Sequence, residues 1–283
     1  MLKIAIQAKG RLNEDCVGLL GDSGITISGG GRKLMSRAHG FPMEVLYLRD
    51  DDIPMAVAMG VADIGIVGLN EIEEKKTDVD ISMPLGFGVC RLSLAVPKNA
   101  DYTGLDWFDG KRIATSYPHI LTEFLKSNNI HAGINEIAGS VELAPAIGLS
   151  DAIFDIVSSG GTLVQNGLVE VETVLQSEAV LICNKNLDSD KLDELEHLKF
   201  RFGSIIGSRG MKYVLMNIPQ ASIAKALDVL PSMKSPTLLP LAAEGWYSLH
   251  TVIAEAELWD KIEQLKAVGA EDILVLQLEN IIK

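Results

Sequence analysis

One stretch of the chain combines residues that can bind a phosphate with residues that can bind a sugar. It runs from Asp151 to Leu163 and reads as a buried strand, a small polar loop and the start of a helix. Because the loop lacks bulky side chains, consecutive backbone N–H groups can approach phosphate oxygens while hydroxyls add donors. The pattern predicts a phosphate-binding loop that needs no lysine; an ordinary strand-to-helix turn is the alternative. The loop residues are Ser158, Ser159, Gly160, Gly161 and Thr162.

Two carboxylates flank the strand that leads into this loop, Asp151 and Asp155. Carboxylates in such places can accept hydrogen bonds from ribose hydroxyls. They can also stabilise the positive charge that develops when a C1–pyrophosphate bond breaks. We therefore expect Asp151 and Asp155 to belong to the catalytic residues.

Other polar residues have simpler interpretations. Asp50, Asp51 and Asp52 precede Pro54 and an apolar stretch that ends at Gly60, which is typical of a helix with acidic groups at its positive end. That structural role explains the aspartates, with metal binding as the alternative. The histidines show no metal-ligand spacing, so we predict no protein-held metal site. They are His39, His119, His131, His197 and His250.

The composition narrows the class of protein. The chain has 283 residues, of which 47% are hydrophobic and 22% charged, so it can bury more than one core. A formal charge of -13 opposes capture of nucleic acid, which needs clustered Lys and Arg. Any polyanionic substrate must therefore be bound by a few local groups rather than by a basic surface.

The cysteines and the apolar runs indicate in which cellular compartment the protein works. Cys16, Cys90 and Cys183 are widely spaced, which predicts free thiols in a reducing cytoplasm rather than disulfides or a zinc site. The N-terminus leads straight into a strand pattern, and no apolar run has the length of a membrane span. We expect neither export nor membrane anchoring.

The elements that must position these residues alternate between strands and helices, which predicts an α/β fold. A second α/β unit follows Cys90 to Pro97, which we expect to be the crossover between lobes, and includes helical or strand segments such as Val141 to Leu149. Ala179 to Cys183 is expected to return the chain to the first lobe, ahead of an amphipathic helix from Ser189 to Phe200. Two crossings predict a cleft between two lobes.

Beyond Gly210 the pattern restarts as a β-α-β-β-α-β unit. Its two helices each carry apolar residues at i, i+4 and i+7, so each presents one face to a sheet. A small sheet with an open edge or face pairs readily with a second copy of itself. This part therefore predicts a homo-oligomer.

Several short motifs occur in an order that resembles the long form of ATP phosphoribosyltransferase along nearly the whole chain. Each motif is weak alone, but their order is specific. They are Lys9-Gly10-Arg11-Leu12, Arg49-Asp50-Asp51-Asp52-Ile53-Pro54, Cys90-Arg91-Leu92-Ser93, Lys111 to His119, Gly139-Ser140-Val141-Glu142, the 158–162 loop running into Asn166-Gly167-Leu168, and Ser235-Pro236-Thr237-Leu238.

The resemblance implies a fold and a division of the chain. The catalytic part is expected to fold like type II periplasmic binding proteins, with lobe I formed by residues 1–92 and 179–207 and lobe II by residues 93–178. Residues 208–283 are expected to form an ACT-like regulatory domain that binds free histidine.

It also implies roles for individual residues. The 158–162 loop is expected to bind the 5-phosphate of 5-phosphoribosyl 1-pyrophosphate. Glu142 is expected near the substrate cleft as a third catalytic carboxylate, although a role at a helix start would also explain that glutamate. Lys9, Arg11 and Arg32 are expected to meet phosphates of ATP or pyrophosphate. Tyr117 is expected to line the nucleotide pocket, unless it only packs at the turn before Pro118. In the regulatory domain, Thr237 and Leu238 are the candidate histidine contacts.

The implied reaction is attack of adenine N1 of ATP on C1 of the ribose, giving N1-(5-phosphoribosyl)-ATP and pyrophosphate, the first step of histidine biosynthesis. Mg²⁺ is the expected cofactor, arriving mostly on the pyrophosphate. The resemblance implies inhibition by histidine and a homo-oligomer, from dimer to hexamer, that needs no separate subunit related to histidyl-tRNA synthetase. A solute-binding protein and a nonenzymatic amino-acid sensor are the alternatives.

Overall fold

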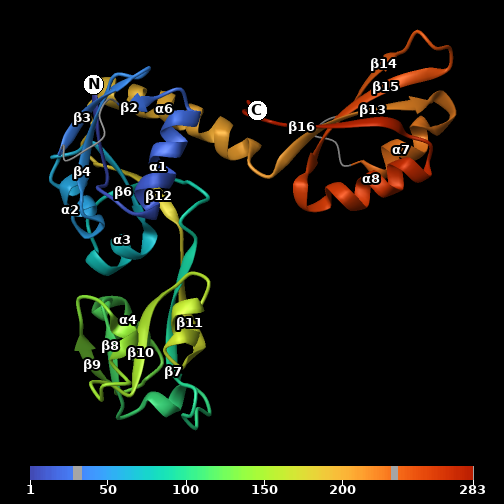
Figure 1. Cartoon of the computed structure of the whole chain (residues 1–283). Coiled ribbons are helices and arrows are strands. Elements are labelled where there is room, and N and C mark those ends of the chain that lie inside the picture. Colours follow the sequence, from blue (N-terminus) through green and yellow to red (C-terminus); the bar gives the residue numbers. More distant parts are fainter. Residues whose placement is uncertain (28–33, 231–234, 283) are drawn as a thin grey trace. The chain divides into compact units, whose positions relative to one another are not determined.

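The computed structural model describes residues 1–27, 34–230 and 235–282. The chain divides into two compact units, Met1–His197 and Leu198–Lys283. The division falls inside one helix, α6 (Ser189–Ser208). Figure 1 shows the elements of each unit.

The first lobe of unit 1 is built on a sheet with the strand order β2-β3-β4-β1-β5-β12-β6. Its central strands β4, β1 and β5 run parallel, and their apolar runs are buried, as expected for a sheet covered on both faces. The strands are β1 (Leu2–Gln7), β2 (Thr26–Ile27), β3 (Met35–His39), β4 (Met43–Leu48), β5 (Ile64–Gly68), β6 (Asp80–Pro84) and β12 (Ala179–Cys183).

Helix α2 of this lobe begins and ends where the sequence predicts. Pro54 lies in the first turn of α2, where its missing N–H costs nothing, and Gly60 adopts the left-handed conformation, φ 72°, just past the end. The helical elements are α1 (Arg11–Asp22), the 3-10 turn η1 (Asp50–Asp52), α2 (Ile53–Ala58) and α3 (Leu69–Lys75).

The second lobe has its own sheet, in the order β11-β7-β10-β8-β9. Phe108, Leu121 and Phe154 are fully buried in its core. The strands are β7 (Cys90–Pro97), β8 (Arg112–Thr115), β9 (Gly133–Glu136), β10 (Ala152–Val157) and β11 (Leu168–Ser177), and the helical elements are η2 (Leu105–Phe108), α4 (Pro118–Ser127), η3 (Val141–Leu143) and α5 (Gly161–Gln165).

Two local expectations need correction. The stretch from Val141 to Leu149 forms only the short turn η3 followed by further turns, because Pro145 lacks an N–H and Gly148 adopts φ 74°. The first crossing between lobes lies at residues 85–89, just before β7 rather than within it. Gly86 and Gly88 have φ of 67° and 63°, which end the strand pairing there.

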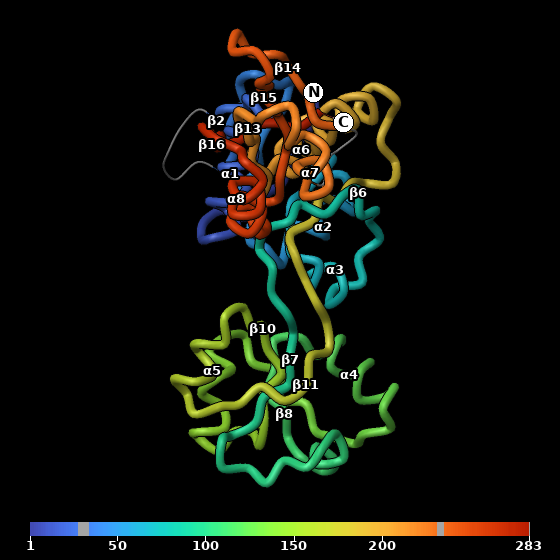
Figure 2. The backbone as a smooth tube through the Cα atoms, turned by 90° about the vertical axis from the view of Figure 1, so that its right-hand side faces the viewer, coloured from blue at the N-terminus to red at the C-terminus, as the bar shows by residue number. Residues whose placement is uncertain are grey.

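The two crossings between the lobes lie against each other. Leu85 donates its backbone N–H to Ala179, at 3.0 Å, and Ala179 donates to Phe87, at 2.9 Å. Figure 2 shows the two connections as separate paths between the lobes. As predicted, β12 returns the chain to the first sheet, where it pairs with β5 and β6.

Unit 2 contains the predicted β-α-β-β-α-β pattern, with the strand order β14-β15-β13-β16. The helices cover one face of this sheet, and Val214, Met216 and Leu249 are buried beneath them. The elements are β13 (Met211–Pro219), η4 (Gln220–Ser222), α7 (Ile223–Val229), β14 (Thr237–Pro240), β15 (Trp246–Ala254), η5 (Glu255–Glu257), α8 (Leu258–Ala267) and β16 (Glu271–Gln277).

The predicted α/β class, with a two-lobed part and a C-terminal sheet domain, is therefore confirmed. Within the described ranges, no helix combines the length and the apolar character that a membrane crossing requires. Cys16, Cys90 and Cys183 form no disulfide with one another.

Candidate active site

The loop predicted to bind phosphate lines a cavity of about 260 Å³ in the second lobe. All five predicted loop residues line it, together with two of the three predicted catalytic carboxylates. The lining residues are Glu142, Asp155, Ile156, Val157, Ser158, Ser159, Gly160, Gly161, Thr162 and Leu163. The structure thus brings the expected phosphate donors and carboxylates to one place.

The local sequence explains the shape of this loop. Gly160 adopts φ 79°, a left-handed conformation that turns the chain sharply between β10 and α5. The Ser159 hydroxyl lies 3.5 Å from the Gly161 amide, and both serine side chains are exposed. Because α5 has only five residues, its dipole is short, and the main anion donors are the loop's own N–H groups and hydroxyls.

The carboxylate of Asp155 is electrostatically unusual. Its partial burial, reinforced by the negative charge of Glu142, raises the pKa of Asp155 to about 6. The Ile156 amide donates to the same carboxylate at 2.8 Å and limits the rise. Asp155 therefore changes charge near neutral pH, as is common for residues in functional sites.

Ser158, the first residue of the loop, is held by Arg91 of the neighbouring strand β7. The Arg91 guanidinium donates to the carbonyl oxygen of Ser158 at 3.1 Å and forms an ion pair with Glu170 on β11. The Ser93 hydroxyl also donates to Glu170, at 2.7 Å. These contacts hold the pKa of Glu170 below its usual range, chiefly through the Arg91 hydrogen bonds.

A second cavity, of about 350 Å³, opens between the two lobes of unit 1 and shares Ile156 and Ser158 with the first. It takes residues from the carboxyl ends of the parallel strands β1, β4 and β5, where α/β folds commonly bind ligands. Its lining residues are Gln7, Gly10, Arg11, Leu12, Asp15, Asp50, Gly68, Asn70, Glu71, Gly88, Val89, Cys90, Ile156, Ser158 and Ala179.

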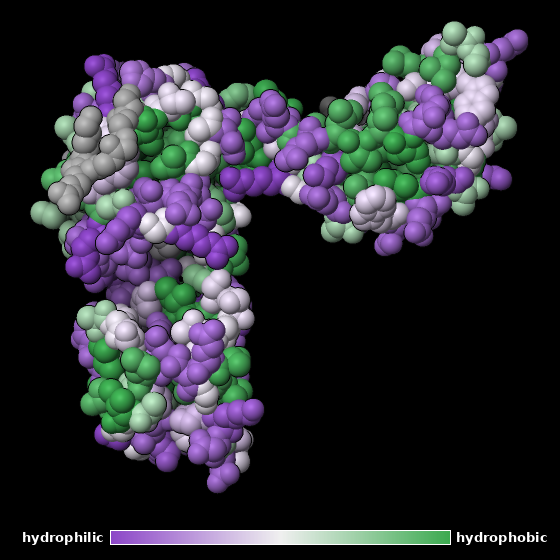
Figure 3. Space-filling view, viewed as in Figure 1, coloured by the Kyte–Doolittle hydropathy of each residue, from purple (hydrophilic) through white to green (hydrophobic). Residues whose placement is uncertain are grey.

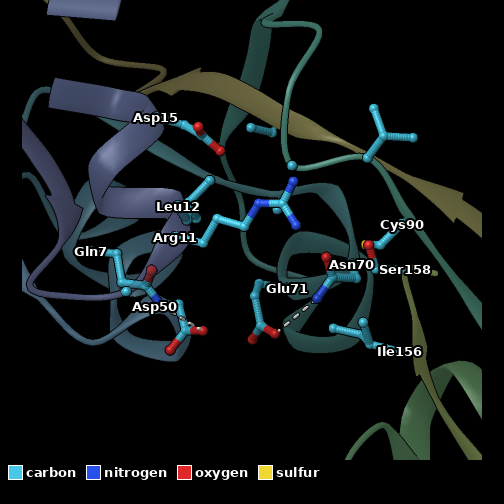
Figure 4. Close-up of a pocket in the computed structure, with 15 residues that line it drawn as sticks. Gln7, Arg11, Leu12, Asp15, Asp50, Asn70, Glu71, Cys90, Ile156 and Ser158 are labelled. Carbon is cyan, nitrogen blue, oxygen red and sulfur yellow. Dashed lines mark hydrogen bonds between the residues drawn. The ribbon is translucent and has the colours of Figure 1, made fainter. Parts of the chain in front are cut away.

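Figure 4 shows how the polar side chains lie in this second cavity. Arg11 extends from the start of α1 toward the centre of the cavity, with Asp15 on the same helix. Gln7 donates to Asp50 at 3.3 Å, which joins the ends of β1 and β4. Arg11 thus brings a positive charge into the cavity, and its contact with a substrate phosphate stays a prediction.

Tyr117 lies in a buried polar cluster beside this cavity. Its hydroxyl donates to Glu71 at 3.2 Å and accepts a hydrogen bond from the Asn70 side-chain amide at 3.3 Å. Burial raises the pKa of Glu71, and that of Tyr117 lies far above its ordinary value for the same reason. Tyr117 does not itself line either cavity; it contacts Asn70 and Glu71, which do.

The other predicted residues lie apart from these two cavities. Asp151 precedes β10 whereas the loop follows it, its carboxylate accepts the backbone N–H of Arg112 at 2.8 Å, and it lines neither cavity, so its catalytic role stays a prediction. Lys9 is exposed after β1 and lines neither cavity. Arg32 lies outside the described residues.

In unit 2, the two candidate effector contacts face opposite sides of the sheet. Leu238 packs against the core beneath the helices, whereas Thr237 is exposed and pairs with His250 on the other face. The His250 ring lies between the Tyr213 hydroxyl, at 2.7 Å, and the Ser248 hydroxyl, at 3.0 Å. One ligand cannot meet both side chains on the same face.

Sequence reasoning missed Gln7, Asp15, Asn70 and Glu71. Gln7 could have been found because it is the last residue of a parallel strand, and ligands commonly bind at the carboxyl ends of such strands. Asn70 and Glu71 lie in the short helix α3, whose pattern carries no site signature. Asp50 was interpreted as a helix-start residue, and it also lines the second cavity.

Fold and site together define a two-lobed α/β protein whose small polar loop and Arg11 line adjoining cavities, an arrangement that suits phosphorylated ligands. The family model described as ATP phosphoribosyltransferase matches residues 49–204, and the one described as HisG, C-terminal domain, matches residues 208–280. The chain belongs to the ATP phosphoribosyltransferase family, in its long form.

Named relatives agree over their whole length. The ATP phosphoribosyltransferase of Bacteroides thetaiotaomicron is 57% identical over 282 residues, covering 100% of both chains. That of Cytophaga hutchinsonii is 50% identical over 283 residues, covering 100% of this chain and 99% of the relative. The chain is therefore a phosphoribosyl-transferring enzyme of histidine biosynthesis with ATP and 5-phosphoribosyl 1-pyrophosphate as substrates, not a solute-binding protein or a nonenzymatic sensor.

A solved structure supports the same fold. The ATP phosphoribosyl transferase (HisG:HisZ) complex from Thermotoga maritima contains a chain that is 30% identical to this one, with a TM-score of 0.61. The match covers 71% of this chain and 98% of that chain.

Proposed function

We propose that the 158–162 loop binds the 5-phosphate of phosphoribosyl pyrophosphate, so that its ribose lies over Asp155 and Glu142. The main observation in support is that all five loop residues and these two carboxylates line the same cavity. Exposed N–H groups and hydroxyls suit a phosphate, and the carboxylates suit ribose hydroxyls. Arg91 supports this arrangement by holding the Ser158 carbonyl group.

The nucleophile is adenine N1 of ATP, so the protein needs no nucleophile of its own. Its work is to align the two substrates and to stabilise the positive charge that builds on the ribose as pyrophosphate leaves. The ionised Asp155 carboxylate supplies negative charge beside that centre. We assign this role to Asp155 and Glu142 and leave Asp151 out of it.

ATP is proposed to occupy the cavity between the lobes, where Arg11 meets its phosphates. Supporting this, the cavity is continuous with the loop through Ile156 and Ser158, which line both spaces. Tyr117 acts on this cavity through Asn70 and Glu71. Lys9, which is exposed near the same strand end, is the weaker candidate for a phosphate contact.

The oxygen donors of this cavity fit a magnesium ion carried on the pyrophosphate. Mg²⁺ prefers oxygen ligands and keeps several waters, so one or two carboxylates suffice, and Asp15 and Asp50 provide them. When bound, the ion neutralises the charge of the leaving group. Among the described residues, no three His, Cys, Asp or Glu side chains form a protein-held metal site.

We propose the expected domain scheme with one boundary moved, because all of β7 (Cys90–Pro97) belongs to the second sheet. Residues 1–89 with 179–207 and residues 90–178 are proposed as the catalytic lobes, and residues 208–283 as a regulatory ACT-like unit that binds histidine. A homo-oligomer is proposed to form through the sheet face of this unit that the helices leave open. Leu239, Leu274 and Leu276 are about half exposed, and Figure 3 shows apolar surface on this unit.

One assay tests the catalytic and regulatory proposals together. ATP, phosphoribosyl pyrophosphate and Mg²⁺ are mixed with the enzyme, and the absorbance of phosphoribosyl-ATP is followed with and without free histidine. Product that requires all three components and is suppressed by histidine is the expected result. Product without suppression contradicts the histidine site, and absence of product contradicts the substrate assignment.

A further inference from the structure

A buried carboxylate of the first lobe caps a helix of the second. Glu74, near the end of α3, is only 5% exposed. Its two oxygens accept the backbone N–H groups of His119 and Ile120, each at 3.0 Å. The His119 ring nitrogen Nδ1 lies 3.0 Å from the same carboxylate. Residues that are more than forty positions apart in the sequence thus join the two lobes.

Helix α4 needs this cap because its own sequence provides none. The N-cap residue is Tyr117, whose side chain makes no capping hydrogen bond, and Pro118 at the first helical position has no N–H. The next two N–H groups, of His119 and Ile120, have no partner within the helix. Glu74 accepts a hydrogen bond from each of them, and its negative charge lies at the positive end of the helix.

The cap lies next to the residues proposed to handle the nucleotide. Asn70 and Glu71, one turn earlier on α3, line the cavity between the lobes and bind the Tyr117 hydroxyl. Tyr117 directly precedes the capped helix. The position of α4 relative to α3 therefore determines where Tyr117 meets Asn70 and Glu71, and with it the shape of that wall of the cavity.

We propose that Glu74 is a positioning residue, which fixes α4 against α3 and so orients Asn70, Glu71 and Tyr117 for nucleotide binding. The residue touches no substrate and acts only through its neighbours. An exposed ion pair, between Lys76 and Glu123, also joins the two helices, at 3.1 Å. Since exposed pairs contribute little, the buried contacts hold this seam, and the Glu74 cap is the one among them that binds the backbone of α4.

The test compares Glu74→Gln and Glu74→Ala with Glu123→Gln as the matched control. Gln keeps one acceptor oxygen, whereas Ala keeps none. We expect the KM for ATP to rise roughly tenfold in Glu74→Ala and less in Glu74→Gln, because charge-assisted hydrogen bonds are lost in steps. The kcat should stay within about threefold, since the reacting groups are intact. Glu123→Gln should leave both constants within about twofold.

Amide hydrogen exchange provides a readout that does not depend on activity. The amides of His119 and Ile120 should both exchange at least about tenfold faster in Glu74→Ala, and one of the two should do so in Glu74→Gln, while those later in α4 keep their protection. Urea unfolding of each variant shows that it is folded under the assay conditions.

This proposal rests on the assignment of the inter-lobe cavity to ATP, and the two can fail separately. If the Glu74 variants are folded and lose protection at His119 and Ile120 but keep the wild-type KM for ATP, Glu74 is only a structural cap and the positioning role is overturned. If protection is unchanged, the cap itself is refuted. Neither result removes the activity of the wild-type enzyme, whose failure to form product would instead contradict the substrate assignment.

Discussion

The guanidinium of Arg91 donates to the carbonyl oxygen of Ser158, at 3.1 Å, from the strand beside the phosphate loop. Ser158 is the one loop residue that lines both cavities of the site. If the two substrates occupy these cavities as proposed, the contact fixes the residue between them. Arg91 is itself held by Glu170, so the loop is connected through β7 to the edge strand β11 of the second sheet.

Replacing Arg91 by Lys should weaken binding of phosphoribosyl pyrophosphate. Lysine keeps the positive charge but lacks the planar fork that reaches Ser158 and Glu170 together. We expect the KM for this substrate to rise about fivefold to tenfold, with the KM for ATP changed less, in steady-state kinetics. A KM for phosphoribosyl pyrophosphate equal to that of the wild type would show that the loop keeps its shape without this contact.

The activity should depend on the charge of Asp155. Because burial raises its pKa to about 6, the carboxylate becomes protonated as the pH falls through this value and no longer stabilises positive charge. We expect kcat/KM for phosphoribosyl pyrophosphate to fall below about pH 6. The Asp155→Asn variant should have a low kcat/KM at every pH and should not show this fall below about pH 6. A wild-type profile that stays level down to pH 5 would rule out this role.

The same pKa has a consequence for stability. The ordinary value is 3.8, so between about pH 4 and pH 6 the folded protein binds a proton that the unfolded chain has lost. The contribution of Asp155 to stability therefore decreases as the pH rises through this window and stays low above it. Asp155→Asn should gain on the order of 2 kcal/mol in urea unfolding at pH 8 and nothing at pH 3.5. Equal gains at both values would contradict the raised pKa.

Asp151, just before β10, can be compared with Asp155, which lies within that strand. Its carboxylate binds Arg112 at the opposite end of β10 from the loop. We therefore expect Asp151→Asn to keep kcat and both KM values within about twofold while losing roughly 0.5–1.5 kcal/mol of stability. A large loss of kcat with unchanged stability would return Asp151 to the catalytic residues.

Replacing Thr237 and replacing Leu238 should have different effects on stability and on the response to histidine. Leu238 packs into the core of unit 2, so Leu238→Ala should destabilise this unit by about 1–3 kcal/mol in urea unfolding. Thr237 lies on the open face, so Thr237→Ala should leave stability within about 0.5 kcal/mol and change the response to histidine. Loss of the histidine response in Leu238→Ala alone, with normal stability, would contradict the assignment of faces.

The sequence predicts the fold well because its signals are local. Pro54 and Gly60 delimit α2, and the spacing of Ile223, Leu227 and Leu230 predicts a helix that packs on one face. The apolar residues from Val141 to Leu149 suggest a longer element than the structure contains. Pro145, which lacks an N–H, and Gly148, with its left-handed conformation, prevent that element from forming. The loop itself was predicted residue by residue, since small residues between a strand and a helix carry their own signal.

The missed site residues depend on contacts that no local pattern encodes. Asn70 and Glu71 enter the site because parallel pairing of β1 with β5 brings the ends of these strands together. Glu74 meets α4 through a contact between the two lobes, across 45 positions of the sequence. Asp151 was expected in the site because it is close to the loop in sequence, although an extended strand separates the two ends by about 3.3 Å per residue.

The most direct test of the central claim is the steady-state KM for phosphoribosyl pyrophosphate after Ser158 and Thr162 are both replaced by Leu. Bulky side chains in the loop should block the approach of a phosphate to the backbone N–H groups. The account predicts a KM raised at least about tenfold, with the affinity for ATP little changed. An unchanged KM for phosphoribosyl pyrophosphate in a folded variant would contradict the assignment of this loop.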